Sequence, residues 1–329
     1  MRNRKNLRKT AYYCVILILV LVLIFSGLQI LESTILLKKQ QVEPVRASKT
    51  VTKDGIAYFP RQDITLILAL GLGIDGPVVS SGYYRNSSEA DAVMLLILDE
   101  TDKSYSVLCL NRDTMVEMPI LGLGGKAAGS TVAQLALAYT YGDGLADSCE
   151  NAKKTVSNLL GGISIDYYLA MSMDAIAIIN DAVGGVTVTV TDDFSQVDAS
   201  IPMGEVTLSG QQALAYVQSR MNVGNQLNIS RMERQKAYMN GLVAAVDYKM
   251  ETEGEGFALK VYEEAASCMV TDLSGNALTG LMSRCKDYTL KEIVSPEGEN
   301  VRGSDYYEFH VDEEALEALV LRLLYAPKK

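Results

Sequence analysis

The chain has 329 residues and a net charge of −10, from 30 basic and 40 acidic residues. The excess of acidic residues argues against nucleic-acid binding, which requires a basic face. The single histidine, His310, lies in a strand-like segment where we expect a structural role. We therefore do not expect the functional site to be a histidine-based zinc site or a Ser-His-Asp triad.

The first residues predict a membrane anchor. Residues 11–31 are 21 consecutive uncharged residues rich in Val, Ile and Leu, which as a helix span roughly the 30 Å of a bilayer core. The five basic residues before them predict a cytoplasmic tail over residues 1–10, and the apolar run exceeds the roughly 7–15 residues of a secretory signal. We therefore predict a single-pass cell-membrane protein, with a polar stalk at 32–60 and an extracellular C-terminal domain.

The exported part is even more acidic than the whole chain. The first 39 residues hold seven basic residues and one acidic residue, so the remainder has 23 basic and 39 acidic residues, a net charge of −16. Any polyanion must therefore be bound by a local cluster of arginines or through a metal ion, because the overall field repels it.

Strands and helices alternate over residues 61–329, which predicts one α/β domain with a mixed central β-sheet sandwiched by helices. The predicted strands are 64–70, 92–98, 105–110, 165–171, 186–190, 288–294 and 306–311. The predicted helices are 133–139, 146–160, 173–183, 208–217, 231–246, 259–269, 277–285 and 313–324. A glycine-rich loop is expected at 121–129. A Cys268–Cys285 disulfide is conceivable outside the cell, although the spacing does not establish it.

Two aspartates flank the loop after the first predicted strand. Residues 71–76 formally match G-x-G-x-x-G, but the loop beginning at Pro77 replaces the helix that a dinucleotide site requires. Asp75 ends one strand and Asp91 begins the next, so adjacent strands would bring both carboxylates to one sheet edge. Mg²⁺ favours such a pair together with phosphate oxygens. Equally, each aspartate can cap a turn, and the residues alone do not decide between these alternatives.

Four arginines predict a phosphate site. Arg112 follows an apolar strand, Arg220 lies just after the predicted helix 208–217, and Arg231 and Arg234 lie one turn apart on the next helix. A guanidinium group is a planar fork of donors that matches a phosphate edge. Taken singly, each arginine is best explained as an exposed surface charge that contributes little to stability. Together, the four indicate a phosphate-binding cluster.

The order of these motifs resembles the LytR-CpsA-Psr family over about residues 64–246. The resemblance lies in Gly73-x-Asp75, Asp91, Arg112-Asp113-Thr114, the segments 181–186 and 208–220, and Arg231-x-x-Arg234-Gln235. It implies a membrane-anchored phosphotransferase of the Gram-positive cell wall. Such an enzyme moves a glycopolymer, for example teichoic acid or capsule, from a polyprenyl-pyrophosphate carrier to a peptidoglycan acceptor, with Mg²⁺ as cofactor.

The resemblance also implies roles for individual residues. Asp75, Asp91 and Arg112 would be catalytic, and the two aspartates would bind the metal. Substrate binding would fall to the remaining positions of the helical motifs, namely Gln218, Arg220, Arg231, Arg234 and Gln235.

Several positions depart from the family pattern. Glu89 and Gln218 stand where the family has arginines, Asn228 replaces a common aspartate, and Gln134 and Ala136 lie in a loop that lacks the usual Lys and Asn. A lost charge-assisted hydrogen bond costs about 1.5–3 kcal/mol. Two alternatives therefore stay open: a non-catalytic envelope protein that binds lipid-linked glycan or regulates other enzymes, and a polyprenyl-pyrophosphate pyrophosphatase.

Overall fold

The computed structural model describes residues 50–122, 125–274, 277, 280–281, 284–285 and 288–327. The predicted cytoplasmic tail, the anchor at 11–31 and most of the stalk lie outside these residues. Among the helices of the described ranges, none combines the length and apolar character needed to cross a membrane.

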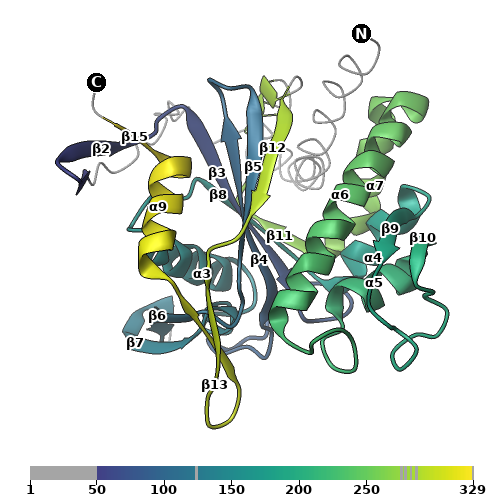
Figure 1. The fold of residues 1–329 in the computed structure, drawn as a ribbon, viewed down its shortest axis with the longest axis horizontal. Helices are drawn as coiled ribbons and strands as arrows, with labels where there is room; N and C mark the ends of the chain where they lie inside the picture. Colours follow the sequence, from purple (N-terminus) through teal and green to yellow (C-terminus); the bar gives the residue numbers. More distant parts are fainter. Residues whose placement is uncertain are drawn as a thin grey trace.

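A six-stranded mixed sheet forms the centre of the domain (Figure 1), in the order β11-β8-β3-β4-β5-β12. Its strands are β3 Ile64–Leu72, β4 Ala90–Asp99, β5 Ser104–Leu110, β8 Tyr167–Met171, β11 Met269–Thr271 and β12 Thr289–Val294. β3 is antiparallel to β4 and parallel to β8, and β5 is antiparallel to β4 and parallel to β12. The predicted mixed sheet is therefore confirmed.

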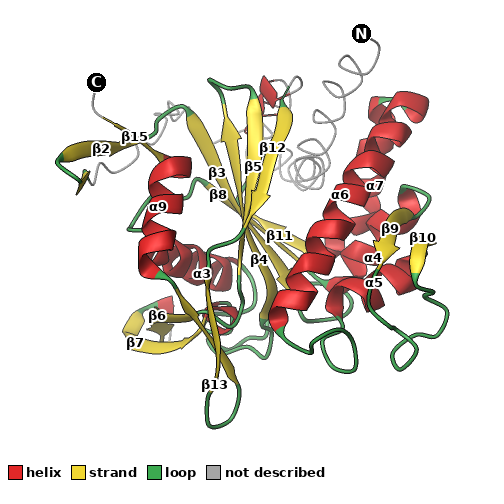
Figure 2. Cartoon of the chain, viewed as in Figure 1, coloured by secondary structure: helices red, strands yellow, loops and turns green. Residues whose placement is uncertain are grey.

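Helices cover both faces of this sheet (Figure 2). They are α3 Ala146–Leu159 and α9 Glu313–Leu324 on one face, and α4 Met173–Ala182, α5 Gly210–Gln218, α6 Asn228–Glu253 and α7 Glu255–Ala265 on the other. Successive side chains of a strand point to opposite faces, so Leu66 and Leu68 pack beneath α3 and α9 whereas Ile67 packs beneath the α4–α7 layer. Burial on both faces explains why β3 to β5 are continuous apolar runs.

Smaller sheets surround this core. They are the hairpins β6 Met115–Leu121 with β7 Ala127–Gln134, β9 Val186–Val190 with β10 Gly204–Leu208, and β13 Gly298–Arg302 with β14 Tyr307–Val311. A three-stranded sheet joins β1 Val51–Lys53 and β2 Ile56–Pro60 to β15 Tyr325–Pro327. Residues 51–60, which we assigned to the stalk, are thus tied to the C-terminal end of the domain.

The structure corrects several predicted elements. The expected loop at 121–129 and the start of the expected helix at 133–139 belong to the β6–β7 hairpin, and only a 3₁₀ turn, Leu135–Ala138, follows. Pairing with β6 outweighs the helical propensity of Ala133 and Gln134. The residues of β10 and β13 were not predicted as strands because both segments are short and largely polar.

The predicted helix boundaries on the α6–α7 side are also revised. α6 begins at Asn228 rather than at 231, and the predicted helix 259–269 is replaced by α7, a 3₁₀ turn at Ala266–Cys268 and β11. Cys268 and Cys285 are both free and buried, so the conceivable disulfide is absent.

Candidate phosphate-binding site

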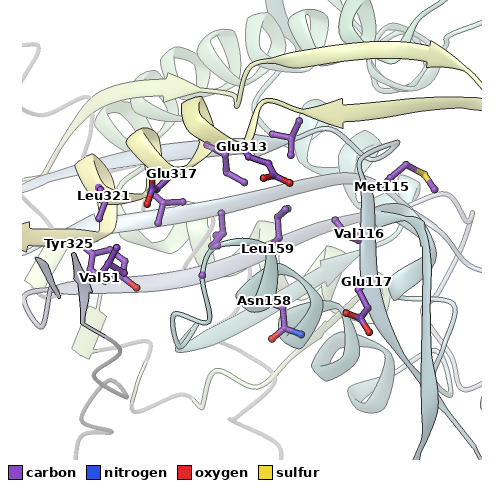
Figure 3. Close-up of a pocket in the computed structure, with 15 residues that line it drawn as sticks. Val51, Met115, Val116, Glu117, Asn158, Leu159, Glu313, Glu317, Leu321 and Tyr325 are labelled. Carbon is purple, nitrogen blue, oxygen red and sulfur yellow. The ribbon is translucent and has the colours of Figure 1, made fainter. Parts of the chain in front are cut away.

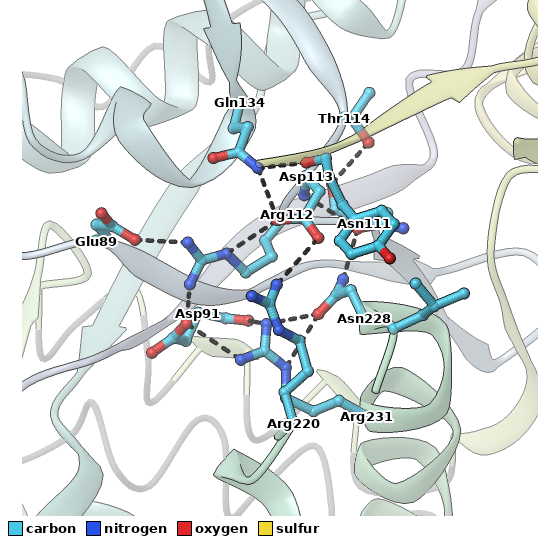
Figure 4. Close-up of polar contacts among 12 residues, drawn as sticks. Glu89, Asp91, Asn111, Arg112, Asp113, Thr114, Gln134, Arg220, Asn228 and Arg231 are labelled. Carbon is cyan, nitrogen blue, oxygen red and sulfur yellow. Dashed lines mark hydrogen bonds and ion pairs between the residues drawn. The ribbon is translucent and has the colours of Figure 1, made fainter. Parts of the chain in front are cut away.

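An arginine cluster lies at one end of the central sheet (Figure 4). We define it by its nine interacting residues, which are Glu89, Asp91, Asn111, Arg112, Asp113, Gln134, Arg220, Asn228 and Arg231. Antiparallel pairing of β4 with β5 places the start of β4 beside the end of β5, with Val93 opposite Leu110. This register brings Asp91 next to Arg112, and the first turn of α6 packs against both.

Arg112 is held between two carboxylates. Its Nη1 donates to Oδ1 of Asp91, its Nη2 donates to Oε2 of Glu89 at 2.5 Å, and its Nε lies 3.5 Å from Oδ1 of Asp113. Burial by itself lowers the pKa of Arg112, but the attraction of the Asp91, Glu89 and Asp113 carboxylates outweighs it, so the pKa is raised. Arg112 therefore stays cationic and points its guanidinium group into the cluster.

Arg231 reaches the same carboxylate from α6. Its Nη1 lies 3.3 Å from Oδ1 of Asp91, and its Nε donates to Oδ1 of Asn228 at 3.0 Å. Nδ2 of Asn228 donates to Oδ1 of Asn111 at 2.5 Å, so the amides link α6 to the end of β5. Burial is the largest cause of the lowered pKa of Arg231, the attraction of Asp91 opposes it, and repulsion from Arg112 adds to it.

Asp113 is the buried partner of the more exposed Arg220. The carboxylate of Asp113 is 1% exposed, and its Oδ2 lies 3.6 Å from Nη1 of Arg220, which is 35% exposed. Nε2 of Gln134 donates to the other oxygen, Oδ1, at 3.0 Å. Burial raises the pKa of Asp113, although Arg112, Arg220 and Arg231 oppose that shift.

Three polar atoms of the cluster are buried without a hydrogen-bond partner among the described residues. They are Nδ2 of Asn111, Nε of Arg112 and Oδ2 of Asp113. A buried polar atom left unpaired costs about 1–3 kcal/mol. The formal charge of the cluster is zero, from three arginines and three carboxylates. The side chains of the cluster are therefore held in position by ion pairs and hydrogen bonds, while three of their buried polar atoms have no hydrogen-bond partner among the described residues.

Asp91 and Asp75 occupy different environments. Oδ1 of Asp91 accepts from both Arg112 and Arg231, whereas no described side chain donates to its Oδ2. A Cβ at Gly73 would lie 2.4 Å from this Oδ2, so glycine makes the space that the carboxylate occupies. Asp75 follows two residues later, is exposed, and has no hydrogen bond or ion pair within the described part of the chain.

Asp75 and Asp91 can be compared with the ligand requirements of Mg²⁺. No group of three or more His, Cys, Asp and Glu side chains in the described ranges is arranged to hold a metal ion. Mg²⁺ needs only one or two carboxylates when phosphate oxygens and water complete its shell. The uncommitted Oδ2 of Asp91 and the exposed carboxylate of Asp75 fit that requirement, so the metal role stays a prediction.

The structure separates Arg234 from the cluster. Its Nε donates to the carbonyl of Tyr216 at 3.0 Å, its Nη2 to the carbonyl of Ser219, and its Nη1 to Asp192 at 2.7 Å. Its guanidinium also lies over the ring of Phe194. These contacts hold the C-terminal end of α5 and favour a structural role for Arg234, so its substrate-binding role stays a prediction.

The two glutamines of the predicted site also lie apart from it. Nε2 of Gln235 donates to the carbonyl of Val217 at 3.2 Å, which is a second tie to the end of α5. Gln218, the last residue of α5, is exposed. Asn111, Gln134 and Asn228 were not predicted as site residues. The sequence marked Gln134 and Asn228 only as departures from the family pattern, and the fold shows which groups these amides bond.

Two cavities border the cluster and share no lining residue. The first, about 370 Å³, includes Asn111, Ile229, Met232, Pro296 and Phe309 in its lining, and we call it the helix cavity because α6 forms one wall. The second, about 510 Å³, lies between the α5–α6 loop and the β13–β14 hairpin and begins at Arg220; we call it the hairpin cavity.

A third cavity lies away from the cluster (Figure 3). Its volume is about 600 Å³, and its walls come from α9, α3, β6 and Val51. The lining is mostly apolar, with Glu117, Asn158, Glu313 and Glu317 at its polar positions. It contains no arginine, so its chemistry does not suit a phosphate group.

Fold and cluster together define an α/β protein that gathers three arginines and three carboxylates at one end of its central sheet. The chain belongs to the LytR_cpsA_psr family, whose profile matches residues 32–323. The resemblance noted from the motifs is thus confirmed.

Two curated relatives carry the same name, polyisoprenyl-teichoic acid–peptidoglycan teichoic acid transferase TagU. The Enterococcus faecalis protein is 30% identical over 181 residues, which cover 55% of this chain and 52% of that protein, about half its length. The Bacillus licheniformis protein is 25% identical over 241 residues and 72% of each chain. The crystal structure of Bacillus subtilis TagV matches with a TM-score of 0.57 at 25% identity, covering 80% of this chain and 96% of that one.

Proposed function

We propose that this protein is a phosphotransferase that moves a glycopolymer from a polyprenyl-pyrophosphate carrier to peptidoglycan. The observation that supports it best is the convergence of Arg112, Arg220 and Arg231 from three separate segments onto one end of the sheet. The names of the curated relatives agree with this chemistry.

In the proposed reaction a sugar hydroxyl of peptidoglycan attacks the phosphorus that bears the glycan. A new P–O bond forms, the bond from that phosphorus to the bridging oxygen breaks, and polyprenyl monophosphate leaves with the electron pair. The hydroxyl proton passes to solvent or to a carboxylate. Such a transfer depends mainly on alignment and charge neutralisation, which buried guanidinium groups provide because they bind phosphate oxygens in fixed geometry.

The arginines differ in how they are available to the pyrophosphate. Arg231 is 5% exposed and Arg112 14% exposed, whereas Arg220 is 35% exposed. Phosphate oxygens would replace the carboxylates as partners of Arg112 and Arg231, and Arg220 would close on the pyrophosphate from the α5–α6 loop. Nε of Arg112 lies 3.5 Å from Oδ1 of Asp113 but makes no hydrogen bond. A phosphate oxygen would give it a hydrogen-bond partner, which favours binding because it removes a desolvation cost.

The helix cavity suits the part of the polyprenyl chain next to the pyrophosphate. Ile229, Met232, Pro296 and Phe309 provide apolar contact surface, and Asn111 connects the cavity to the cluster. Burial of apolar surface contributes about 25 cal/mol per Å², so even a few isoprene units would add binding energy.

We include Mg²⁺ in the proposal as a cofactor held by Asp91 and Asp75. Such an ion, when bound, neutralises pyrophosphate charge. The residues of the chain would orient it through the Oδ2 atom of Asp91, to which no described side chain donates a hydrogen bond. Calorimetric titration of the protein with Mg²⁺ alone, in the native chain and in Asp91→Asn, tests this point without reference to activity.

The proposed location is the outer face of the cell membrane of a Gram-positive bacterium, with residues 11–31 as a single span and residues 1–10 in the cytoplasm. The charge distribution of the sequence supports this topology. Cysteine labelling of full-length protein in intact cells tests it, because a cysteine placed at the exposed Tyr83 must then react with a membrane-impermeant reagent.

The decisive experiment uses the full-length chain in detergent with a polyprenyl-pyrophosphate disaccharide, with and without Mg²⁺. We expect release of polyprenyl monophosphate and its loss in Arg112→Ala. Unchanged release in both Arg112→Ala and Asp91→Ala would refute the assignment. A dependence of release on an added glycan acceptor separates transfer from the pyrophosphatase alternative, in which water attacks.

A second candidate function is a non-catalytic envelope protein that binds lipid-linked glycan. Glu89, Asp91 and Asp113 neutralise the charge of the three arginines. This neutralisation favours the non-catalytic function, because each phosphate contact must displace an existing ion pair. Gln218→Arg places a further guanidinium at the exposed end of α5. A large gain in turnover would indicate that the natural protein binds without efficient catalysis, whereas an unchanged rate favours the enzyme.

A further inference from the structure

We propose that Asn86 is a positioning residue for Glu89: it fixes the turn before β4 and thereby holds the Glu89 carboxylate against Arg112. This inference rests on the proposed function, because the carboxylate of Glu89 competes with phosphate for the Arg112 guanidinium. The hydrogen bonds of the Asn86 side chain go to other segments of the chain, so Asn86 acts on the arginine only through Glu89.

The side chain of Asn86 is the centre of a buried hydrogen-bond network. Asn86 is 5% exposed, and its Nδ2 has four acceptors within hydrogen-bond distance. They are the carbonyls of Tyr139, Thr140 and Gly142, at 2.9, 3.3 and 3.1 Å, and Oγ of Ser148 at 2.9 Å. An amide has two N–H donors, so the four acceptors share them. The network ties Asn86 to residues 139–142 and to the first turn of α3.

The backbone of the turn is fixed as well. The N–H of Asn86 donates to the carbonyl of Thr140 at 2.9 Å, and Oγ1 of Thr140 donates to the carbonyl of Ser88 at 3.0 Å. Oδ1 of Asn86 accepts from the N–H of Ser88 at 2.7 Å, a local turn that asparagine favours. Residues 86–88 are therefore held in a defined conformation where the chain approaches β4.

Glu89 follows this turn directly, so the turn decides where its side chain begins. Its carbonyl accepts from the N–H of Gly73 at 3.0 Å, which holds the backbone on the β3 side. Its side chain is 42% exposed and pairs with Nη2 of Arg112 at 2.5 Å (Figure 4). Because a long exposed side chain loses conformational freedom in an ion pair, this pair depends on a backbone that places the carboxylate within reach.

Asp91 does not depend on the turn in the same way. It lies in β4, where Ala90 is opposite Leu72 and Ala92 is opposite Gly71, so strand pairing holds the backbone on both sides of Asp91. Loss of the Asn86 network would therefore loosen the contact of Glu89 with Arg112 and leave the Asp91 backbone in place. This difference makes the two carboxylates separable by experiment.

The network would set how readily Arg112 accepts a phosphate oxygen. Nη1 of Arg112 is engaged by Asp91 and Nη2 by Glu89, so a phosphate oxygen reaches Nη2 only by displacing Glu89. A carboxylate that is held in place competes more strongly than one that is free to turn into solvent. Asn86 would thus lower the affinity for a pyrophosphate ligand by keeping the competitor in position.

A double-mutant cycle in the full-length chain in detergent tests the proposal, with farnesyl pyrophosphate as the calorimetric probe. We expect Asn86→Ala to raise the affinity about two- to threefold, less than the gain of up to about fivefold expected when Glu89→Gln removes the competing charge. In the Glu89→Gln background, Asn86→Ala should change the affinity no further. Thr140→Val is a milder second variant, which removes the hydrogen bond to Ser88 and should act in the same direction.

Asn180→Ala is the matched control. Asn180 is a fully buried asparagine on α4, whose Nδ2 donates to the carbonyl of Leu208 at 2.9 Å and whose Oδ1 accepts from the hydroxyl of Tyr238 at 3.1 Å. The substitution removes a comparable network away from the arginine cluster. It should leave the affinity for farnesyl pyrophosphate unchanged.

Urea denaturation of the same proteins adds a measurement that needs no ligand. The losses of stability in Asn86→Ala and Glu89→Gln should be less than additive in the double variant, whereas those of Asn180→Ala and Glu89→Gln should add.

Two results would overturn the positioning role. One is a fall in affinity in Asn86→Ala, or an equal change with and without Glu89, since either would make the network a general support of the site. The other is additive losses of stability in Asn86→Ala and Glu89→Gln. If the unsubstituted chain did not bind the probe, the proposed function would fail, while the denaturation cycle would still decide on Asn86.

Discussion

Arg231 on α6 and Asp91 on β4 form an ion pair with 3.3 Å between Nη1 and Oδ1, although 140 residues separate them in the chain. Arg112, which follows β5, donates to the same Oδ1 atom. One carboxylate oxygen therefore joins two guanidinium groups from different elements. Three charged groups that share one atom are strongly coupled, so a change in any of them is expected to alter the other two.

Substitutions at Arg231 and Arg234 can separate an effect on ligand binding from an effect on folding. Both lie on α6 one turn apart, and both are buried. We expect Arg231→Ala to lower transfer activity about 100- to 1,000-fold, because it removes a preorganised phosphate donor. Arg231→Lys should recover little of it, since an ammonium cannot reproduce the planar fork. The measurement is release of polyprenyl monophosphate, with folding checked by circular dichroism.

For Arg234→Ala the expected loss is in stability. The substitution leaves Asp192 without its partner and frees the carbonyls of Tyr216 and Ser219. We expect the free energy of unfolding to fall by about 2–3 kcal/mol, measured by urea denaturation. A protein of native stability that lost only activity would return Arg234 to the substrate site.

Gly73→Ala should perturb the cluster through Asp91 alone. The added Cβ would lie 2.4 Å from Oδ2 of Asp91, so the carboxylate must shift and its contacts with Arg112 and Arg231 must change. We expect activity to fall at least tenfold while the domain remains folded. Gly280→Ala is the control, because a Cβ there meets no atom of the described residues within 4 Å. Equal activity of the two variants would show that the Asp91 position tolerates displacement.

Glu89→Gln should strengthen binding of a pyrophosphate ligand. Glu89 is 42% exposed and pairs with Arg112 at 2.5 Å, so its charge competes with phosphate for the same guanidinium. Ion pairs at this exposure contribute up to about 1 kcal/mol, which corresponds to a gain in affinity of up to about fivefold. Farnesyl pyrophosphate titrated by calorimetry measures the change.

The control for this substitution is Glu253→Gln, which removes a similarly exposed ion pair with Lys249 at 2.6 Å on α6. It should leave the affinity unchanged. A weaker affinity in Glu89→Gln that depends on Mg²⁺ would instead identify Glu89 as a metal ligand and contradict the expectation of competition.

The decrease in the free energy of unfolding at low pH should depend in part on Asp63. A hydrogen bond from Arg61 is the largest cause that lowers the pKa of Asp63 to about 2; burial opposes it and a hydrogen bond from Thr101 supports it. Because the folded pKa is below the unfolded value of about 3.9, this stabilisation is complete above the unfolded value and is lost as the pH falls toward 2.

Asp63→Asn is therefore expected to be less stable than the native chain at pH 6. The difference in free energy of unfolding should shrink between pH 4 and pH 2 and vanish near pH 2. Urea denaturation at several pH values measures it. A difference that stayed constant with pH would show that the carboxylate charge of Asp63 does not contribute.

The motifs of the sequence identified the family and most charged residues of the site because those residues are local signals. Arg112 and Asp113 directly follow an apolar strand, and Asp91 opens another, so a sheet edge with opposite charges could be predicted. The mixed sheet likewise follows from apolar runs alternating with helical segments. These patterns do not give the spatial distance between segments that are far apart in the chain.

The roles of individual side chains depended on the tertiary structure. Arg231 and Arg234 have the same residue type and the same helix, yet one meets Asp91 and the other meets the end of α5. Their separation by three positions rotates them to different neighbours, and the packing of α6 decides which neighbours those are. Asn228 and Gln134 acquired their roles only through the groups they bond.

By itself, the sequence determined the α/β class, the charge distribution and the family, since apolar periodicity and motif order do not require knowledge of contacts. The tertiary structure decided which guanidinium groups share a carboxylate, which one holds the end of a helix, and that the β13–β14 hairpin closes a cavity at Arg220. The physical reason is that hydrogen bonds and ion pairs act over about 3–4 Å, a range that only the folded arrangement of the chain defines.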